Sequence, residues 1–160
     1  MLSVCSDTHA EDPARVEFTQ ASVKPTLVTI DQQSAALDHF IVEDGVAYAG
    51  QHLVFDFWGA SQLDNLALLE QAFRDCVDAC GATLLHLHLH HFTPTGGISG
   101  VAVLAESHIS VHTWPEINYA AFDVFMCGDA RPHEAIPVLQ RAFAPAQIEL
   151  KTLKRGQIGD

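Results

Sequence analysis

The sequence predicts an α+β protein, a two-layer sandwich in which an antiparallel sheet carries two helices on one face. Several β-prone runs are joined in part by short turns, as in an antiparallel sheet. Two further stretches repeat apolar residues at intervals of three and four, which is typical of helices. A chain of 160 residues, 48% of them hydrophobic, can bury one core, so a single folded domain is expected.

The first part of the chain differs in composition from the rest. Residues 1–45 are rich in acidic side chains, and their apolar residues are scattered without a period. We therefore expect a flexible N-terminal extension over 1–45, with a short strand near Val28 or Ile41. The folded domain is expected over 46–160.

The first strand and the first helix of this domain follow one another. Residues 53–58 form an apolar, β-prone run, which predicts a largely buried strand. A helix is expected next, with Ser61 or Asp64 as its N-cap and Gly81 at its end. Its apolar face is formed by Leu66, Leu69, Phe73, Cys76, Val77 and Cys80.

Two strands and a loop come next. Residues 83–91 alternate leucine with histidine, which predicts a strand with the two residue types on opposite faces. The glycines of the loop 92–100 allow the backbone to come close to another group. A short strand is expected at 101–105, and the alternation of Ile109 and Val111 with polar residues predicts another within 106–116.

The C-terminal part completes the expected fold. A strand is predicted at 119–127 and a last one at 148–153. Between them a helix should cover about 130–144, with Asp129 as its cap and Pro132 in its first turn. Pro137 should kink this helix or delay its start, because proline cannot donate a backbone hydrogen bond.

Charge and composition exclude several classes of function. The net charge is −12, with 8 basic residues against 20 acidic ones, so a nucleic-acid partner is not expected. An acidic surface weakly favours a cationic ligand. The sequence has neither a membrane-spanning run nor a secretory signal, and its four cysteines form no paired framework. A cytoplasmic protein is therefore expected.

Three histidines on one strand, His86, His88 and His90, suggest a metal site. Side chains two residues apart on a strand diverge, however, and no nearby carboxylate or cysteine completes a ligand set. No metal site is therefore expected.

Ser107 with His112 or His108 as its base would suggest a hydrolase. The Gly-x-Ser-x-Gly turn that exposes the serine of such an enzyme is missing, so a hydrolase is not favoured.

Several motifs occur together in one order. Residues 106–116 read Glu-Ser-His-Ile-Ser-Val-His-Thr-Trp-Pro-Glu, and 119–128 read Tyr-Ala-Ala-Phe-Asp-Val-Phe-Met-Cys-Gly. Upstream stand Gly50-x-His52, the run 91–94 (His-Phe-Thr-Pro) and the run 97–100 (Gly-Ile-Ser-Gly). Over about residues 50–130 the chain resembles the short prokaryotic S-adenosylmethionine decarboxylases, which are self-cleaving proenzymes.

The resemblance implies a role for each of five residues. Those enzymes cut a Glu-Ser bond, which matches Glu106-Ser107, and the serine becomes a pyruvoyl group that forms a Schiff base with the substrate. Ser99 matches the serine that assists the cleavage, and His112 matches the histidine that takes up a proton during it. Cys127 matches the proton donor of the decarboxylation.

The resemblance also implies a substrate and an assembly. Phe92 would stack on the adenine of S-adenosylmethionine, and Glu116 would hold the ribose hydroxyls. The product would supply spermidine synthesis, and active sites would form in a homodimer of cleaved chains. Two alternatives stay open: a pyruvoyl-dependent decarboxylase of ornithine or arginine, and an uncleaved, non-catalytic homologue.

Overall fold

The computed structural model describes residues 39–158, which form seven strands and two α-helices. The elements are β1 (Ile41–Glu43), β2 (Val46–Trp58), α1 (Leu66–Cys80), β3 (Leu84–His91), β4 (Ile98–Leu104), β5 (Ser107–Trp114), β6 (Tyr119–Met126), α2 (Ala135–Phe143) and β7 (Gln147–Ile158). Single 3₁₀ turns precede β6 and α2, at Pro115–Ile117 and Pro132–Glu134.

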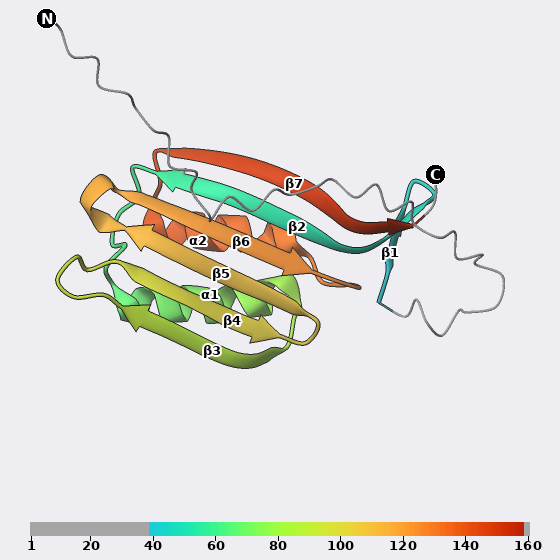
Figure 1. The fold of residues 1–160 in the computed structure, drawn as a ribbon, viewed down its shortest axis with the longest axis horizontal. Coiled ribbons are helices and arrows are strands. Elements are labelled where there is room, and N and C mark those ends of the chain that lie inside the picture. Colours follow the sequence, from blue (N-terminus) through green and yellow to red (C-terminus); the bar gives the residue numbers. More distant parts are fainter. Residues whose placement is uncertain (1–38, 159–160) are drawn as a thin grey trace, which may run out of the picture.

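All pairings in the sheet are antiparallel (Figure 1). The strands follow the order β7-β2-β6-β5-β4-β3, and β1 pairs with the start of β2. Both β1 and β7 pair with Ala47 and Tyr48, so they lie on opposite edges of β2. Since β7 also runs beside the part of β2 that pairs with β6, β1 lies on the same edge of β2 as β6, beyond the end of β6.

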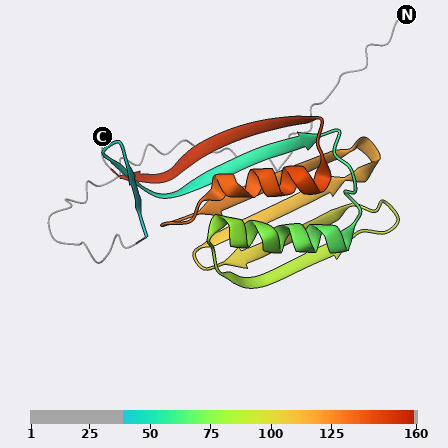
Figure 2. The ribbon, with the colours of Figure 1, turned by 180° about the vertical axis from the view of Figure 1, so that it is seen from behind.

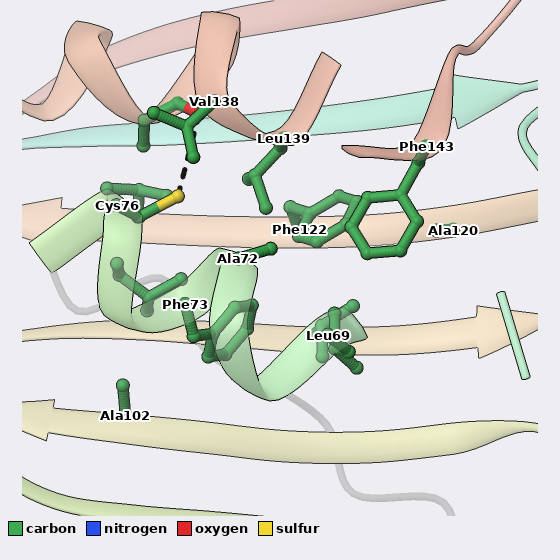
Figure 3. Packing of buried hydrophobic residues seen from close by; sticks show 14 of the residues in the cluster. Leu69, Ala72, Phe73, Cys76, Ala102, Ala120, Phe122, Val138, Leu139 and Phe143 are labelled. Atoms are coloured by element: carbon green, nitrogen blue, oxygen red, sulfur yellow. Dashed lines mark hydrogen bonds between the residues drawn. The ribbon is translucent and has the colours of Figure 1, made fainter. Parts of the chain in front are cut away.

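Both helices cover one face of the sheet, which Figure 2 shows from the helix side. Phe55, Phe122 and Phe143 are fully buried between the two layers. The thiol of Cys76 on α1 lies 3.7 Å from the carbonyl oxygen of Ala135 on α2, which ties the two helices together (Figure 3). The predicted α+β two-layer sandwich with two helices on one face is therefore confirmed.

The ends of the helices differ in part from the expectation. Asn65, not Ser61 or Asp64, caps α1, and its side chain accepts a hydrogen bond from the Leu68 amide. The Ser61 hydroxyl instead donates to the Phe143 carbonyl. Gly81 ends α1 in the left-handed conformation, as predicted.

The start of α2 is later than expected. The helix begins only at Ala135, after the 3₁₀ turn that Pro132 opens, so Asp129 does not cap it. Pro137 therefore falls in the first turn, where its missing amide hydrogen costs no helix bond.

Three strands extend beyond their predicted ends. β2 begins at Val46 instead of residue 53, β4 at Ile98 instead of 101, and β7 ends at Ile158 instead of 153. On β3 the alternation is broken by a register shift between Leu84 and His86, which leaves Leu85 63% exposed.

The start of the described chain joins the same sheet. The expected strand near Ile41 is present as β1, whereas the alternative near Val28 lies outside the described residues. Residue 45 lies in the turn between β1 and β2. No helix in the described part of the chain is long and apolar enough to span a membrane.

Candidate active site

One cavity of about 290 Å³ gathers four of the predicted site residues, Phe92, Ser99, His112 and Glu116. It lies at the end of the sheet where β3 leads into the loop before β4, and where β5 ends in the turn before β6. The remaining residues that line it are Thr95, Gly97, Thr113 and Trp114.

Close backbone packing holds the loop against β5. Gly97 approaches so closely that a Cβ at this position would lie 2.8 Å from the Thr113 carbonyl oxygen. The buried Thr113 hydroxyl accepts a hydrogen bond from the Ile98 amide and donates to the Leu63 carbonyl, both at 2.8 Å. These contacts fix the loop between Phe92 and Ser99 and hence the wall of the cavity.

Ser99 and His112 form a direct polar pair in this cavity. They are cross-strand partners on β4 and β5, and Ser99 Oγ lies 2.7 Å from His112 Nδ1. A hydroxyl bonded to an imidazole is an arrangement suited to moving a proton. Phe92 is 44% exposed and packs edge-to-face on His90 with ring centroids 4.6 Å apart, so the exposed part of its ring can contact a ligand.

The other three predicted residues, Glu106, Ser107 and Cys127, meet at the opposite end of the sheet. Ala105 and Glu106 form the tight turn between β4 and β5, where Leu104 pairs with Ser107. Glu106 has φ +58°, a left-handed conformation that costs a non-glycine residue about 1–2 kcal/mol. The bond that follows this strained residue is the predicted cleavage site.

Ser107 and Cys127 are in contact in the uncut chain. The Cys127 amide donates a hydrogen bond of 3.3 Å to the hydroxyl of Ser107, which is buried. Burial raises the pKa of the Cys127 thiol, and the nearby Glu106 carboxylate raises it further. A thiol that keeps its proton at neutral pH can act as an acid.

The two clusters are separated along the same strand. Ser107 begins β5 and His112 lies five residues later, about 16 Å away at the rise of an extended strand. The odd spacing also places them on opposite faces, and the buried residues of β5 alternate accordingly. Within one chain, the Ser99–His112 pair therefore does not reach Ser107.

The face of the sheet away from the helices carries polar residues to which sequence reasoning gave no role. His52, His108, Phe125 and Arg155 line a cavity of about 200 Å³. His52 Nε2 lies 3.5 Å from the Asp123 carboxylate, and desolvation followed by the charge of His52 lowers the pKa of His108. Strand parity is the signal that could have grouped them, since His52 and His108 both pair with Phe125.

The same face exposes an aromatic row. Tyr119 lies between Trp58 and Trp114, with ring centroids 4.4 and 5.2 Å apart, and both tryptophans are about two-fifths exposed. The Tyr119 hydroxyl donates a 2.6 Å hydrogen bond to Asp56. Burial first, and then this bond, raises the pKa of Tyr119 to about 12. An antiparallel sheet that exposes such a row has a surface suited to contact with another protein.

The histidines of β3 form no recognisable metal centre. His86, His88 and His90 are exposed along this edge strand. Across residues 39–158, no three histidine, cysteine, aspartate or glutamate side chains are grouped closely enough to hold a metal ion.

Comparison with known proteins places the sequence among decarboxylases. The sequence profile described as S-adenosylmethionine decarboxylase matches residues 51–156. The chain is 46% identical over 112 residues to the S-adenosylmethionine decarboxylase proenzyme of Thermomicrobium roseum, covering 69% of this chain and 97% of that protein. Its identity to the proenzyme of the same name from Methanococcus aeolicus is 46% over 114 residues, covering 69% and 97%.

A solved structure has the same fold. The crystal structure of the adenosylmethionine decarboxylase from Aquifex aeolicus superposes with a TM-score of 0.62 at 28% identity. The match covers 71% of this chain and 95% of that chain.

Proposed function

Because the chain belongs to the S-adenosylmethionine decarboxylase family, we propose that it cuts itself between Glu106 and Ser107 and then releases carbon dioxide from S-adenosylmethionine. It is a carboxy-lyase, and its product would donate aminopropyl groups for spermidine synthesis. The observation that carries the proposal is the hairpin in which a strained Glu106 precedes a serine held against Cys127.

Self-cleavage needs an attacking hydroxyl, donors for an oxyanion and a base. The Ser107 hydroxyl attacks the Glu106 carbonyl carbon, so that the C–N bond breaks as an ester C–O bond forms. Ser99 donates a hydrogen bond to the oxyanion of this step. His112 then takes the α-proton of residue 107 and expels the Glu106 carboxylate. Hydrolysis of the remaining dehydroalanine releases ammonia and leaves a pyruvoyl group.

The residues around position 107 fit this group. A pyruvoyl group at position 107 would supply the electron sink that the loss of carbon dioxide requires. Cys127 lies beside position 107 and holds a proton that it can deliver to the substrate carbon. Cutting the hairpin also frees position 107 to turn away from the buried side of the sheet.

The cavity at the other end of β5 suits the nucleoside part of the substrate. We place the adenine against Phe92, whose ring is exposed at its rim, and the ribose hydroxyls on the Glu116 carboxylate. An aromatic face also attracts the positive sulfonium of this substrate. Ornithine and arginine lack a purine and a ribose, so this cavity favours S-adenosylmethionine over them.

A homodimer reconciles the two separated clusters. In an isologous pair with the two open sheet faces in contact, a two-fold axis lying between the sheets and perpendicular to the strands would bring the Ser99–His112 pair of one chain to the Glu106-Ser107 turn of the other. The exposed row of Trp58, Tyr119 and Trp114 supports this face as the contact surface. Each active site would then use residues of both chains.

The substrate is tested by carbon dioxide release from carboxyl-labelled compounds. Purified full-length protein should release labelled carbon dioxide from S-adenosylmethionine and not from ornithine or arginine. Release only from a basic amino acid would overturn the substrate assignment. No release from any of the three, in a chain that stays uncut, would favour the non-catalytic alternative.

A further inference from the structure

The segment before the family match folds back onto the predicted cleavage site. The match begins at residue 51, whereas the described chain begins at His39. β1 lies on the same edge of β2 as β6, beyond the end of β6. The chain therefore enters the sheet near the point where it leaves β6. Figures 1 and 2 both show the start of β1 beside the segment that follows β6.

His39 makes two contacts at this junction. Its carbonyl oxygen accepts a hydrogen bond of 2.9 Å from the amide of Gly128, which directly follows Cys127. Its ring Nδ1 lies 2.9 Å from Oε2 of Glu106. One backbone contact therefore fixes His39 in place, and its side chain reaches the residue whose carbonyl is to be attacked.

The turn that contains Glu106 needs such a support. Glu106 has a positive φ, which an L-residue adopts at a cost, so contacts that hold this turn offset that cost. The amide of Ala105 is held by the Thr83 carbonyl at 2.9 Å. The contact with His39 is the corresponding restraint on Glu106.

We propose that His39 is a positioning residue for self-cleavage: its ring holds the Glu106 side chain, which keeps the Glu106 carbonyl within reach of the Ser107 hydroxyl. After the cut, the same contact keeps the new chain end at Glu106 beside Cys127. This inference rests on the proposed self-cleavage. It assigns a role to a residue that lies outside residues 51–156, which the family profile matches.

The test is the rate at which freshly translated full-length chain is cut, followed on denaturing gels. His39→Ala should slow cleavage roughly two- to five-fold, as expected for the loss of one contact between exposed polar side chains. His39→Asn keeps an N–H donor near the position of Nδ1 and should restore most of the rate. The matched control is His133→Ala, which removes an exposed histidine of the turn before α2 and should leave the rate unchanged.

A double-mutant cycle separates positioning from a general loss of structure. If His39 acts through Glu106, His39→Ala should have no further effect in a Glu106→Ala chain. A wild-type chain that is cut as slowly as His39→Ala would overturn this inference alone, and so would an undiminished effect in the Glu106→Ala chain. A wild-type chain that is never cut would overturn the proposed self-cleavage itself.

Discussion

Ser107 and His112 lie on the same strand, five residues apart, and point to opposite faces of the sheet. One is the predicted nucleophile of self-cleavage and the other the predicted base. Because a strand is rigid over this length, they cannot meet within one chain. If both residues take part in self-cleavage, as we propose, we expect the base that serves Ser107 to come from a second copy.

Mixed dimers test this directly. A Ser107→Ala chain has no hydroxyl to attack, and a His112→Ala chain should be cut at least about 100-fold more slowly for lack of a base. When the two are co-expressed, the His112→Ala chain should be cut, because its Ser107 meets the His112 of its partner. Gel analysis with chains of different tag length measures which chain is cut.

The control replaces the Ser107→Ala chain with one that carries both changes. This chain offers no intact His112, so co-expression should restore nothing. Equal, slow cutting of the His112→Ala chain with either partner would show that the site forms within a single chain.

Cys127→Ala should separate cleavage from turnover. The chain should still be cut, but decarboxylation should fall about 100-fold, because the proton donor is lost. Burial and Glu106 raise the pKa of Cys127 above its ordinary value of 9.0, so the wild-type rate should not fall with loss of this proton until the pH exceeds about 9. Carbon dioxide release measured against pH checks both points, and an unchanged rate in the variant would refute the assignment.

Glu116→Gln should weaken substrate binding without affecting self-cleavage. The carboxylate accepts the ribose hydroxyls more strongly than an amide does, so KM should rise about tenfold while the chain is cut at the normal rate. Glu70→Gln, on the exposed side of α1 and away from the cavity, is the matched control. A KM that stays the same in Glu116→Gln would remove this residue from the binding site.

The buried thiol of Cys80 should make the fold sensitive to alkali. Burial raises its pKa from 9.0 to about 11, so between these values the unfolded chain loses the proton and the folded chain keeps it. Its contribution to the free energy of unfolding is complete below pH 9 and falls as the pH rises, by about 1–3 kcal/mol. Urea unfolding of the uncut Ser107→Ala chain between pH 8 and about 11 measures this.

In the Ser107→Ala chain, Cys80→Ala should make the free energy of unfolding depend less steeply on pH. Part of the dependence on pH should remain, because Cys76 and Tyr119 also have raised pKa values. An equal slope with and without the Cys80 thiol would contradict the assignment.

The sequence was sufficient for the layers of the fold but not for the ends of its elements. The early start of β2 at Val46 depends on pairing with β1, which directly precedes it, and with β7, which is distant in the sequence. Asn65 caps α1, whereas Ser61 lies in the segment before the helix, where its amide and its hydroxyl both donate to the distant Phe143 carbonyl. Such choices are made by tertiary contacts, which local propensity does not contain.

The motifs were sufficient to predict which residues form the candidate site, but not how these residues are arranged in space. The motif lists Ser99, Ser107 and His112 together, whereas the structure pairs Ser99 with His112 and leaves Ser107 with Cys127. The odd spacing of Ser107 and His112 on a strand could have predicted this separation. The contact of His39 with Glu106 could not be foreseen, because the two residues are brought together only by the return of β1 to the end of β6.

The intact mass of the protein under denaturing conditions tests the central claim most directly. The wild-type chain should give two fragments, one ending at Glu106 and one beginning at position 107. The second should be lighter than its serine-ended form by the change from an N-terminal serine to a pyruvoyl group. Ser107→Ala should give a single full-length chain, while Ser110→Ala, three residues along the same strand, should be cut normally. A wild-type chain that remains one full-length species, with no fragment beginning at position 107, would contradict the account.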